Sequence, residues 1–148
     1  MRTQTTVTEL NHEDIVNLLC TACYGSNFFD VTYKKSDYYD TPLYSDNDCL
    51  EDKWAKLLLN GKSIRVCDYY SEECVYGKLP HSWDKEAQCM RYTVTLQDIK
   101  DGLARALDSD TYIATYARHF AEEECVNFDQ PEAEALLQFI VFGEEIYG

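Results

Sequence analysis

The segment from 129 to 146 constrains the fold most, because it predicts a helix that is apolar on most of its sides. Asp129 stands at the N-cap position and Pro131 lies in the first turn, where these residue types are favoured. Apolar side chains then occupy nearly the whole circumference: Leu136, Leu137, Phe139, Ile140, Val141, Phe142 and Ile146. A helix of this kind must be surrounded by other elements. We therefore expect it to be the most buried helix of the fold.

Four further segments show the apolar spacing of amphipathic helices. They are 12–24, after the capping pair Asn11 and Asp14; 45–60, beginning at Ser45 and Asp48; a segment capped by Thr95 and Asp98, with Ile99, Leu103, Ala106 and Leu107 on its inner side; and about 110–124. Gly25 ends the first of them and Gly61 the second, because glycine is favoured just after a helix.

Three segments alternate apolar and polar residues as strands do: 28–33, 62–69 and 90–96. In the last of them, Met90, Tyr92, Val94 and Leu96 are expected to face inward. The connection before it, 71–89, is unusually long for a compact domain. Strands mixed irregularly with helices favour an α+β fold. We predict a single domain, 1–148, with a small three-stranded, mainly antiparallel sheet packed against about five helices and a helical C-terminal half.

Charge sets the class of partner, since 27 acidic residues against 13 lysines and arginines give a net charge of −14. Such a molecule is repelled by nucleic acids and by anionic membranes, and attracted to basic proteins. We therefore expect no direct nucleic-acid binding and no membrane association. The N-terminal segment lacks the apolar core of a secretory signal, and no apolar run is long enough to span a bilayer. With an odd set of seven cysteines, this predicts a cytoplasmic protein with reduced thiols.

Candidate chemical sites are few. Cys20 and Cys23 form a CxxC pair, but a structural zinc site needs four ligands and the chain has no second such pair. Because both cysteines lie on or beside the apolar stripe of the first helix, we interpret them as small buried hydrophobic residues. We expect no metal and no cofactor.

An enzymatic alternative stays open. Nucleophilic catalysis by a Cys/His pair requires only that the two side chains meet in space. Cys74, His81 and Cys89 all lie in the long connection 71–89. A carboxylate pair could also serve, although 27 acids make any given pair uninformative.

The acids are unevenly distributed, in three blocks at 36–52, 68–73 and 119–148. These blocks hold six, three and eight of the 27 acids and no lysine or arginine. The helix dipole favours acids near helix N-termini, which accounts for Asp46 to Asp52, but not for Asp37 and Asp40 in the preceding loop. Solubility would be served by a net charge of magnitude roughly 2–8. We hypothesise that the acids imitate nucleic-acid phosphates, with the neighbouring tyrosines supplying rigid contact area.

Small, strongly acidic, tyrosine-rich single domains of this size resemble the DNA-mimic inhibitors that phages and mobile elements encode, among them anti-CRISPR and antirestriction proteins. The resemblance is one of composition and covers no motif. The segments RYTVTLQDIKDGLARAL and LLQFIVFGEEIYG are also similar to short uncharacterised proteins from mobile elements of gut bacteria. The resemblance implies an inhibitor in the cytoplasm of a bacterial host, whose acidic face occupies the basic nucleic-acid channel of a CRISPR nuclease or restriction enzyme.

We therefore predict a protein that is not an enzyme and whose partner is a basic nucleic-acid-binding protein, with a homodimer left open. An acidic adaptor of a mobile element, with a basic partner unrelated to nucleic acid, is the remaining alternative. The expected contact residues are acids and tyrosines of the three blocks: Asp37, Tyr38, Tyr39, Asp40, Tyr44, Asp46, Asp48, Glu51, Asp52, Asp68, Tyr69, Tyr70, Glu72, Glu73, Glu122, Glu123 and Glu124.

Overall fold

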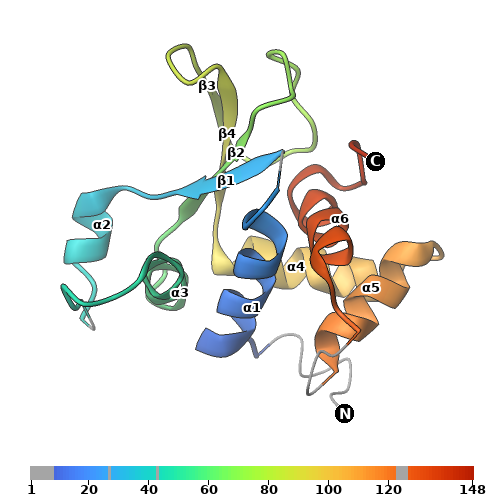
Figure 1. Ribbon diagram of the computed structural model, residues 1–148, viewed down its shortest axis with the longest axis horizontal. Coiled ribbons are helices and arrows are strands. Elements are labelled where there is room, and N and C mark those ends of the chain that lie inside the picture. Colours follow the sequence, from blue (N-terminus) through green and yellow to red (C-terminus); the bar gives the residue numbers. More distant parts are fainter. Residues whose placement is uncertain (1–8, 27, 43, 123–126) are drawn as a thin grey trace.

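The computed structural model describes residues 9–26, 28–42, 44–122 and 127–148. These residues form an α+β fold in which six helices accompany a four-stranded sheet (Figure 1). The elements are, in chain order, α1 (His12–Cys23), β1 (Phe29–Thr32), α2 (Lys35–Tyr39), α3 (Leu50–Leu59), β2 (Ile64–Asp68), β3 (His81–Asp84), β4 (Cys89–Val94), α4 (Leu96–Leu107), α5 (Tyr112–Ala121) and α6 (Gln130–Phe142). No helix in the described ranges is both long enough and apolar enough to cross a membrane.

The sheet is antiparallel throughout and has the strand order β1-β2-β4-β3. Val31, Val66 and Tyr92 lie side by side across three strands and are all buried. Three of the four residues expected to face inward, Met90, Tyr92 and Val94, are buried as predicted. The fourth, Leu96, is half-buried and is the first residue of α4, because β4 ends at Val94. One face of the sheet therefore contributes to the core.

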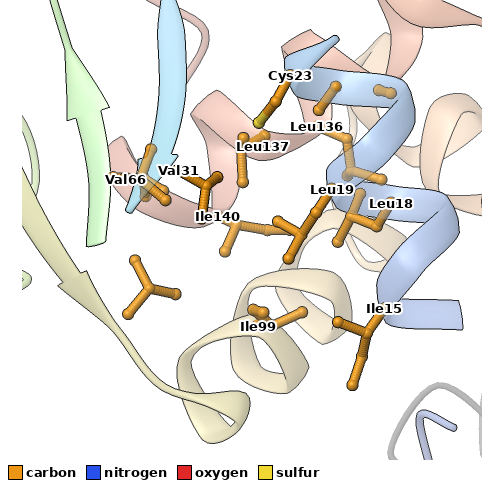
Figure 2. Close-up of a cluster of buried hydrophobic side chains, with 14 of the residues drawn as sticks. Ile15, Leu18, Leu19, Cys23, Val31, Val66, Ile99, Leu136, Leu137 and Ile140 are labelled. Atoms are coloured by element: carbon orange, nitrogen blue, oxygen red, sulfur yellow. The ribbon is translucent and has the colours of Figure 1, made fainter. Parts of the chain in front are cut away.

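Helix α6 is the centre of the helical layer and packs against α1, α4 and α5. More of its residues are buried than in any other described helix, which confirms the expectation from its apolar circumference. Figure 2 shows Leu136, Leu137 and Ile140 of α6 meeting α1 and the strands. Helix α4 approaches closely at Gly102, where a Cβ atom would lie 2.8 Å from Cγ1 of Ile140. The two helices therefore leave no room for a side chain at this position.

The C-terminal tail after α6 is held by two buried polar side chains. The Gln138 amide oxygen accepts hydrogen bonds from the backbone N–H of Ile146 (2.7 Å) and of Tyr147 (2.8 Å). The Tyr147 hydroxyl donates to the buried carboxylate of Asp68 at 2.8 Å. The Tyr147 ring also stacks on Phe28, with centroids 5.2 Å apart. The tail thereby ties α6 to the end of β2.

Several predicted boundaries were wrong. The sheet has four strands and not three, because β3 lies inside the connection 71–89 and pairs with β4. Helix α2 occupies a segment that was expected to be a loop. Helix α3 begins at Leu50, with Cys49 as its N-cap, and not at Ser45. Helix α6 ends at Phe142, because Gly143 adopts the left-handed conformation (φ 84°) that terminates helices.

Candidate functional site: two acidic surfaces with exposed tyrosines

The three acidic blocks lie at separate places on the molecule (Figure 1). The first is at α2 and the loop that leads to α3, at the left of the view. The second is the turn after β2, beyond the sheet, and the third begins at the C-terminal end of α5, below α6. Glu122 is the C-cap of α5, whereas Glu123 and Glu124 lie outside the described residues. The backbone segments that carry the three blocks are therefore separated in the fold.

The first surface, which we call the α2–α3 corner, consists of Asp37, Tyr39, Asp40, Tyr44 and Asp46. The Tyr39 and Tyr44 side chains are 59% and 37% exposed and contact each other edge to face, with centroids 5.1 Å apart. Asp40 and Asp46 are exposed and Asp37 is half-buried. None of the three aspartates forms an ion pair with a described residue. The corner thus presents two rings among three unpaired carboxylates.

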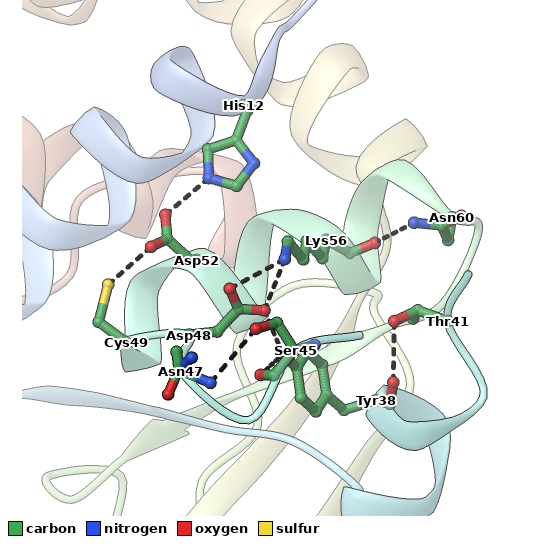
Figure 3. Close-up of polar contacts among 10 residues, drawn as sticks. All are labelled: His12, Tyr38, Thr41, Ser45, Asn47, Asp48, Cys49, Asp52, Lys56 and Asn60. Carbon is green, nitrogen blue, oxygen red and sulfur yellow. Dashed lines mark hydrogen bonds and ion pairs between the residues drawn. The ribbon is translucent and has the colours of Figure 1, made fainter. Parts of the chain in front are cut away.

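Buried contacts beneath the corner hold it in place (Figure 3). Tyr38 is only 2% exposed, and its hydroxyl lies 2.9 Å from the Ser45 carbonyl oxygen and contacts the Asp48 carboxylate. Lys56 forms an ion pair with Asp48 at 2.7 Å. Although burial opposes the ionisation of Asp48, the hydrogen bonds from Lys56 and Tyr38 lower its pKa. The loop between α2 and α3 is therefore fixed from below by an ionised carboxylate.

Lysines reduce the charge around the corner but do not cancel it. The ammonium group of Lys53 lies 5.5 Å from the centroid of the Tyr38 ring. Lys34 and Lys35 are exposed at the start of α2. Their position places positive charge on one side of the corner, whereas Asp40 and Asp46 lie in the lysine-free loop that follows. The acidic character of the corner is strongest in that loop.

Some predicted contact residues are not available to a partner. Tyr38 and Asp68 are buried, because Tyr38 supports the corner and Asp68 receives the Tyr147 hydroxyl, so their assignment as contact residues is corrected here. Asp48 is engaged by Lys56. Glu51 and Asp52 are half-buried, and both carboxylates accept hydrogen bonds from within the protein: Glu51 from Tyr24, and Asp52 from Cys49 with a further contact to His12.

The second surface is a cleft lined by Tyr69, Glu72, Glu73, Trp83 and Gln88, which we call the β2–β3 cleft. Its two carboxylates lie in a tight turn, where the backbone N–H of Cys74 donates to the Ser71 carbonyl oxygen at 2.8 Å. Tyr70, from the same block, does not line this cleft; it is 51% exposed and packs on Phe28 with centroids 5.1 Å apart. Of the predicted contact residues in this block, only Asp68 is buried.

The residues of the enzymatic alternative are not gathered into a site. His81 pairs with Tyr92 at one end of the β3–β4 ladder, and Cys89 pairs with Asp84 at the other end. Cys89 is buried, and His81 contacts the backbone oxygen of Leu79 at 3.0 Å. Cys74 is exposed in the turn after β2. The three side chains therefore lie apart: His81 and Cys89 at opposite ends of the β3–β4 ladder, and Cys74 in the turn after β2.

A different Cys–Asp–His contact, which no sequence pattern predicted, joins the start of α1 to the start of α3 (Figure 3). The Asp52 carboxylate lies between the Cys49 thiol (2.8 Å) and Nε2 of His12 (2.7 Å). Because the thiol donates to a carboxylate, the pKa of Cys49 is raised. A thiol nucleophile needs the opposite, a base or a cation that favours the thiolate.

The CxxC pair lies in and beside the core, as its place in the apolar stripe predicted. Cys23 is buried, and burial raises the pKa of its thiol to about 12. Cys20 is half-buried, and its pKa is also raised, chiefly by burial. Within the described ranges, no three His, Cys, Asp or Glu side chains converge so that they could hold a metal ion.

Comparison of the sequence and the structure with known proteins identified no relative. A scan against protein-family models, a search of curated proteins and a search of solved structures each found no match.

Proposed function

We propose that this protein is a non-catalytic inhibitor that binds the basic nucleic-acid-binding surface of a bacterial defence effector, a CRISPR nuclease or a restriction enzyme. The α2–α3 corner is its principal contact surface, and the host cytoplasm is its place of action. One observation carries the proposal: the corner exposes two tyrosine rings among aspartates that have no described ion-pair partner.

The chemistry of the corner suits a surface that normally holds phosphates. Carboxylates accept charge-assisted hydrogen bonds from lysine and arginine, as phosphate oxygens do. Tyrosine supplies rigid contact area and a ring face on which an arginine can stack. Because Tyr38 and the Asp48–Lys56 pair fix the loop from below, little ordering is required when a partner binds.

Because the acidic blocks are separated, the protein is not expected to imitate a long stretch of nucleic acid along one face. An inhibitor that covers a long nucleic-acid channel would need its carboxylates along one face. Here α2, the connection from β2 to β3 and the C-terminal end of α5 lie in different parts of the molecule (Figure 1). The proposal is therefore that one corner enters the channel, while the remaining acids attract the partner from a distance.

Competition with DNA tests the proposal. A panel of purified CRISPR nucleases and restriction enzymes is incubated with the protein, and binding of each nuclease to its own DNA is measured by fluorescence anisotropy. We expect at least one member to lose DNA binding at a stoichiometric ratio, with an inhibition constant that rises steeply with salt. Inhibition by far less than one equivalent would indicate turnover and would support the enzymatic alternative instead.

Charge-reversal variants locate the contact. The double change Asp37→Lys and Asp40→Lys should weaken inhibition by about tenfold or more, because it places cations against a basic surface. The matched control is Asp108→Lys with Asp110→Lys, which alters net charge equally at the junction of α4 and α5, on the opposite side of Figure 1. Equal losses in both variants would show that net charge alone matters and would exclude the corner as the contact surface.

A further inference from the structure

The β2–β3 cleft combines two aromatic side chains with two carboxylates, and neither aromatic ring contacts another described aromatic ring. Of the 12 tyrosines, Tyr69 alone makes no ring contact with another described aromatic side chain. Of the two tryptophans, Trp54 packs against Tyr24 at 6.2 Å, whereas Trp83 contacts no described ring. The two unpaired aromatic residues line the same cleft, and Tyr69 is 41% exposed.

The backbone around the cleft is also unusual. Only Glu72 (φ 49°), Glu73 (φ 69°) and Gln88 (φ 53°) have a left-handed conformation among the described residues other than glycine, and all three line this cleft. Such conformations are disfavoured for residues with a Cβ atom, and asparagine or glycine would be preferred in the turn. Backbone strain of this kind is often found at functional sites. Local stability therefore does not explain why glutamates occupy the turn.

Charged groups near the cleft leave its carboxylates unpaired. Arg91 is already engaged by Asp84, with Nη2 and Oδ2 separated by 2.6 Å. Lys85 and Glu86 are exposed in the turn between β3 and β4 and balance each other in charge. Neither Glu72 nor Glu73 forms an ion pair with a described residue. The cleft thus keeps a local excess of two negative charges.

From this arrangement we propose that the β2–β3 cleft binds an arginine side chain of a protein partner, with the guanidinium group stacked on Tyr69 or Trp83 and hydrogen-bonded to Glu72 and Glu73. Arginine fits better than lysine, because the guanidinium group is planar, weakly hydrated and able to contact a ring and a carboxylate at once. Metal binding is a poorer match, since two of the lining side chains are aromatic. The cleft uses other residues than the α2–α3 corner, so the inference holds whether or not the partner is a nuclease.

Titration with short peptides tests the proposal on the intact protein. The probes are acetyl-Gly-Arg-Gly-amide and acetyl-Gly-Lys-Gly-amide at constant ionic strength, and the readout is the pair of tryptophan indole N–H signals in the ¹H–¹⁵N NMR spectrum. The Trp83 signal should shift saturably with the arginine peptide, with a Kd on the order of 1 mM. The Trp54 signal should stay in place, because that side chain is 1% exposed and provides an internal control.

Variants decide whether the cleft is the site. The double change Glu72→Gln and Glu73→Gln keeps the size of both side chains and should weaken binding of the arginine peptide about tenfold. The Asp37→Lys and Asp40→Lys variant should bind the peptide as the unmodified protein does. Trp83 packs partly against the core, so its replacement by phenylalanine serves only to assign the signal.

Three results would overturn the inference. The first is a Trp83 signal that does not move with the arginine peptide. The second is equal shifts with the arginine and lysine peptides, because that would indicate attraction by net charge. The third is undiminished binding after both glutamates are replaced by glutamine. Failure of arginine binding can be distinguished from failure of the proposed inhibition, because the two depend on different residues. The Asp37→Lys and Asp40→Lys variant should lose inhibition but still bind the arginine peptide.

Discussion

The turn at Ser71–Cys74 offers a direct test of whether this protein retains glutamates at a cost in stability. Both central residues, Glu72 and Glu73, have positive φ angles, and the backbone N–H of Cys74 closes the turn on Ser71. This is the geometry of a type I′ turn, for which Asn-Gly is the favoured central pair. Replacing Glu72 by asparagine and Glu73 by glycine should therefore stabilise the fold.

The expected gain in the free energy of unfolding is the sum of three contributions. A left-handed conformation costs an ordinary residue about 1–2 kcal/mol, and glycine does not incur this cost. Glycine loses more conformational freedom on folding, which offsets about 0.5–1 kcal/mol of the gain. Asparagine tolerates the conformation better than glutamate and adds some tenths of a kcal/mol. The sum is about 1 kcal/mol, which for a domain of this size corresponds to a rise in Tm of about 2–4 °C.

Urea denaturation and thermal melting measure the gain. The control is the Glu72→Gln and Glu73→Gln variant, which removes the same two charges but keeps the strained backbone, so its stability should change by less than about 0.5 kcal/mol. If both variants were stabilised equally, charge repulsion and not backbone strain would explain the effect. If neither were stabilised, the strain argument would be wrong. The Asn-Gly variant should also lose binding of the arginine peptide, because it lacks both carboxylates.

Two further predictions concern the buried contact between the C-terminal tail and β2. Tyr147→Phe should lower the free energy of unfolding by about 1–3 kcal/mol, because it removes a donor from buried Asp68. Tyr112→Phe, at the exposed contact with Glu145, should change it by less than about 0.5 kcal/mol, and equal losses would contradict the role of burial. Burial raises the pKa of Asp68 in the folded state above its usual value of 3.8. The folded state therefore binds this proton more readily, so the stability of the protein relative to Asp68→Asn should rise as the pH falls from 7 toward 4, and a flat difference would refute the argument.

The helices were predicted well from the sequence where a capping residue is followed directly by apolar residues at helical spacing. The reciprocal hydrogen bonds of Asn11 with Asp14 and of Thr95 with Asp98 are both formed, and Asp129 caps α6 as expected. The members of each pair are three residues apart, so they can be recognised without knowledge of the fold. The start of α3 was misplaced because Ser45 and Asp48 have the same spacing but are used otherwise. Ser45 and Asp48 contact the hydroxyl of Tyr38 instead.

The missed strand and the buried contact residues depend on distant parts of the chain. The strand β3, with the sequence His-Ser-Trp-Asp, lacks an apolar alternation, and it forms because β4 offers an unpaired edge. Asp68 resembles its exposed neighbours in the sequence, but a residue 79 positions later supplies the hydroxyl that accompanies its burial. Sequence spacing contains no information about such a pair. The same limit applies to the β2–β3 cleft, whose aromatic side chains, Tyr69 and Trp83, come from the end of β2 and from β3.

The separation of the acids also separates two roles that net charge can have in binding. At physiological salt, a charge is screened beyond about 8 Å, whereas a domain of this length is about 35–40 Å across. Acids far from the contact therefore do not affect the lifetime of the complex, and their remaining effect, on the rate of encounter, grows as the salt concentration is lowered. Acids within the contact act on the lifetime of the complex. The variant at Asp37 and Asp40 and the control at Asp108 and Asp110 should both slow association, but only the first should speed dissociation. A shared effect on dissociation would mean that the partner surrounds the molecule, which a single contact corner cannot explain.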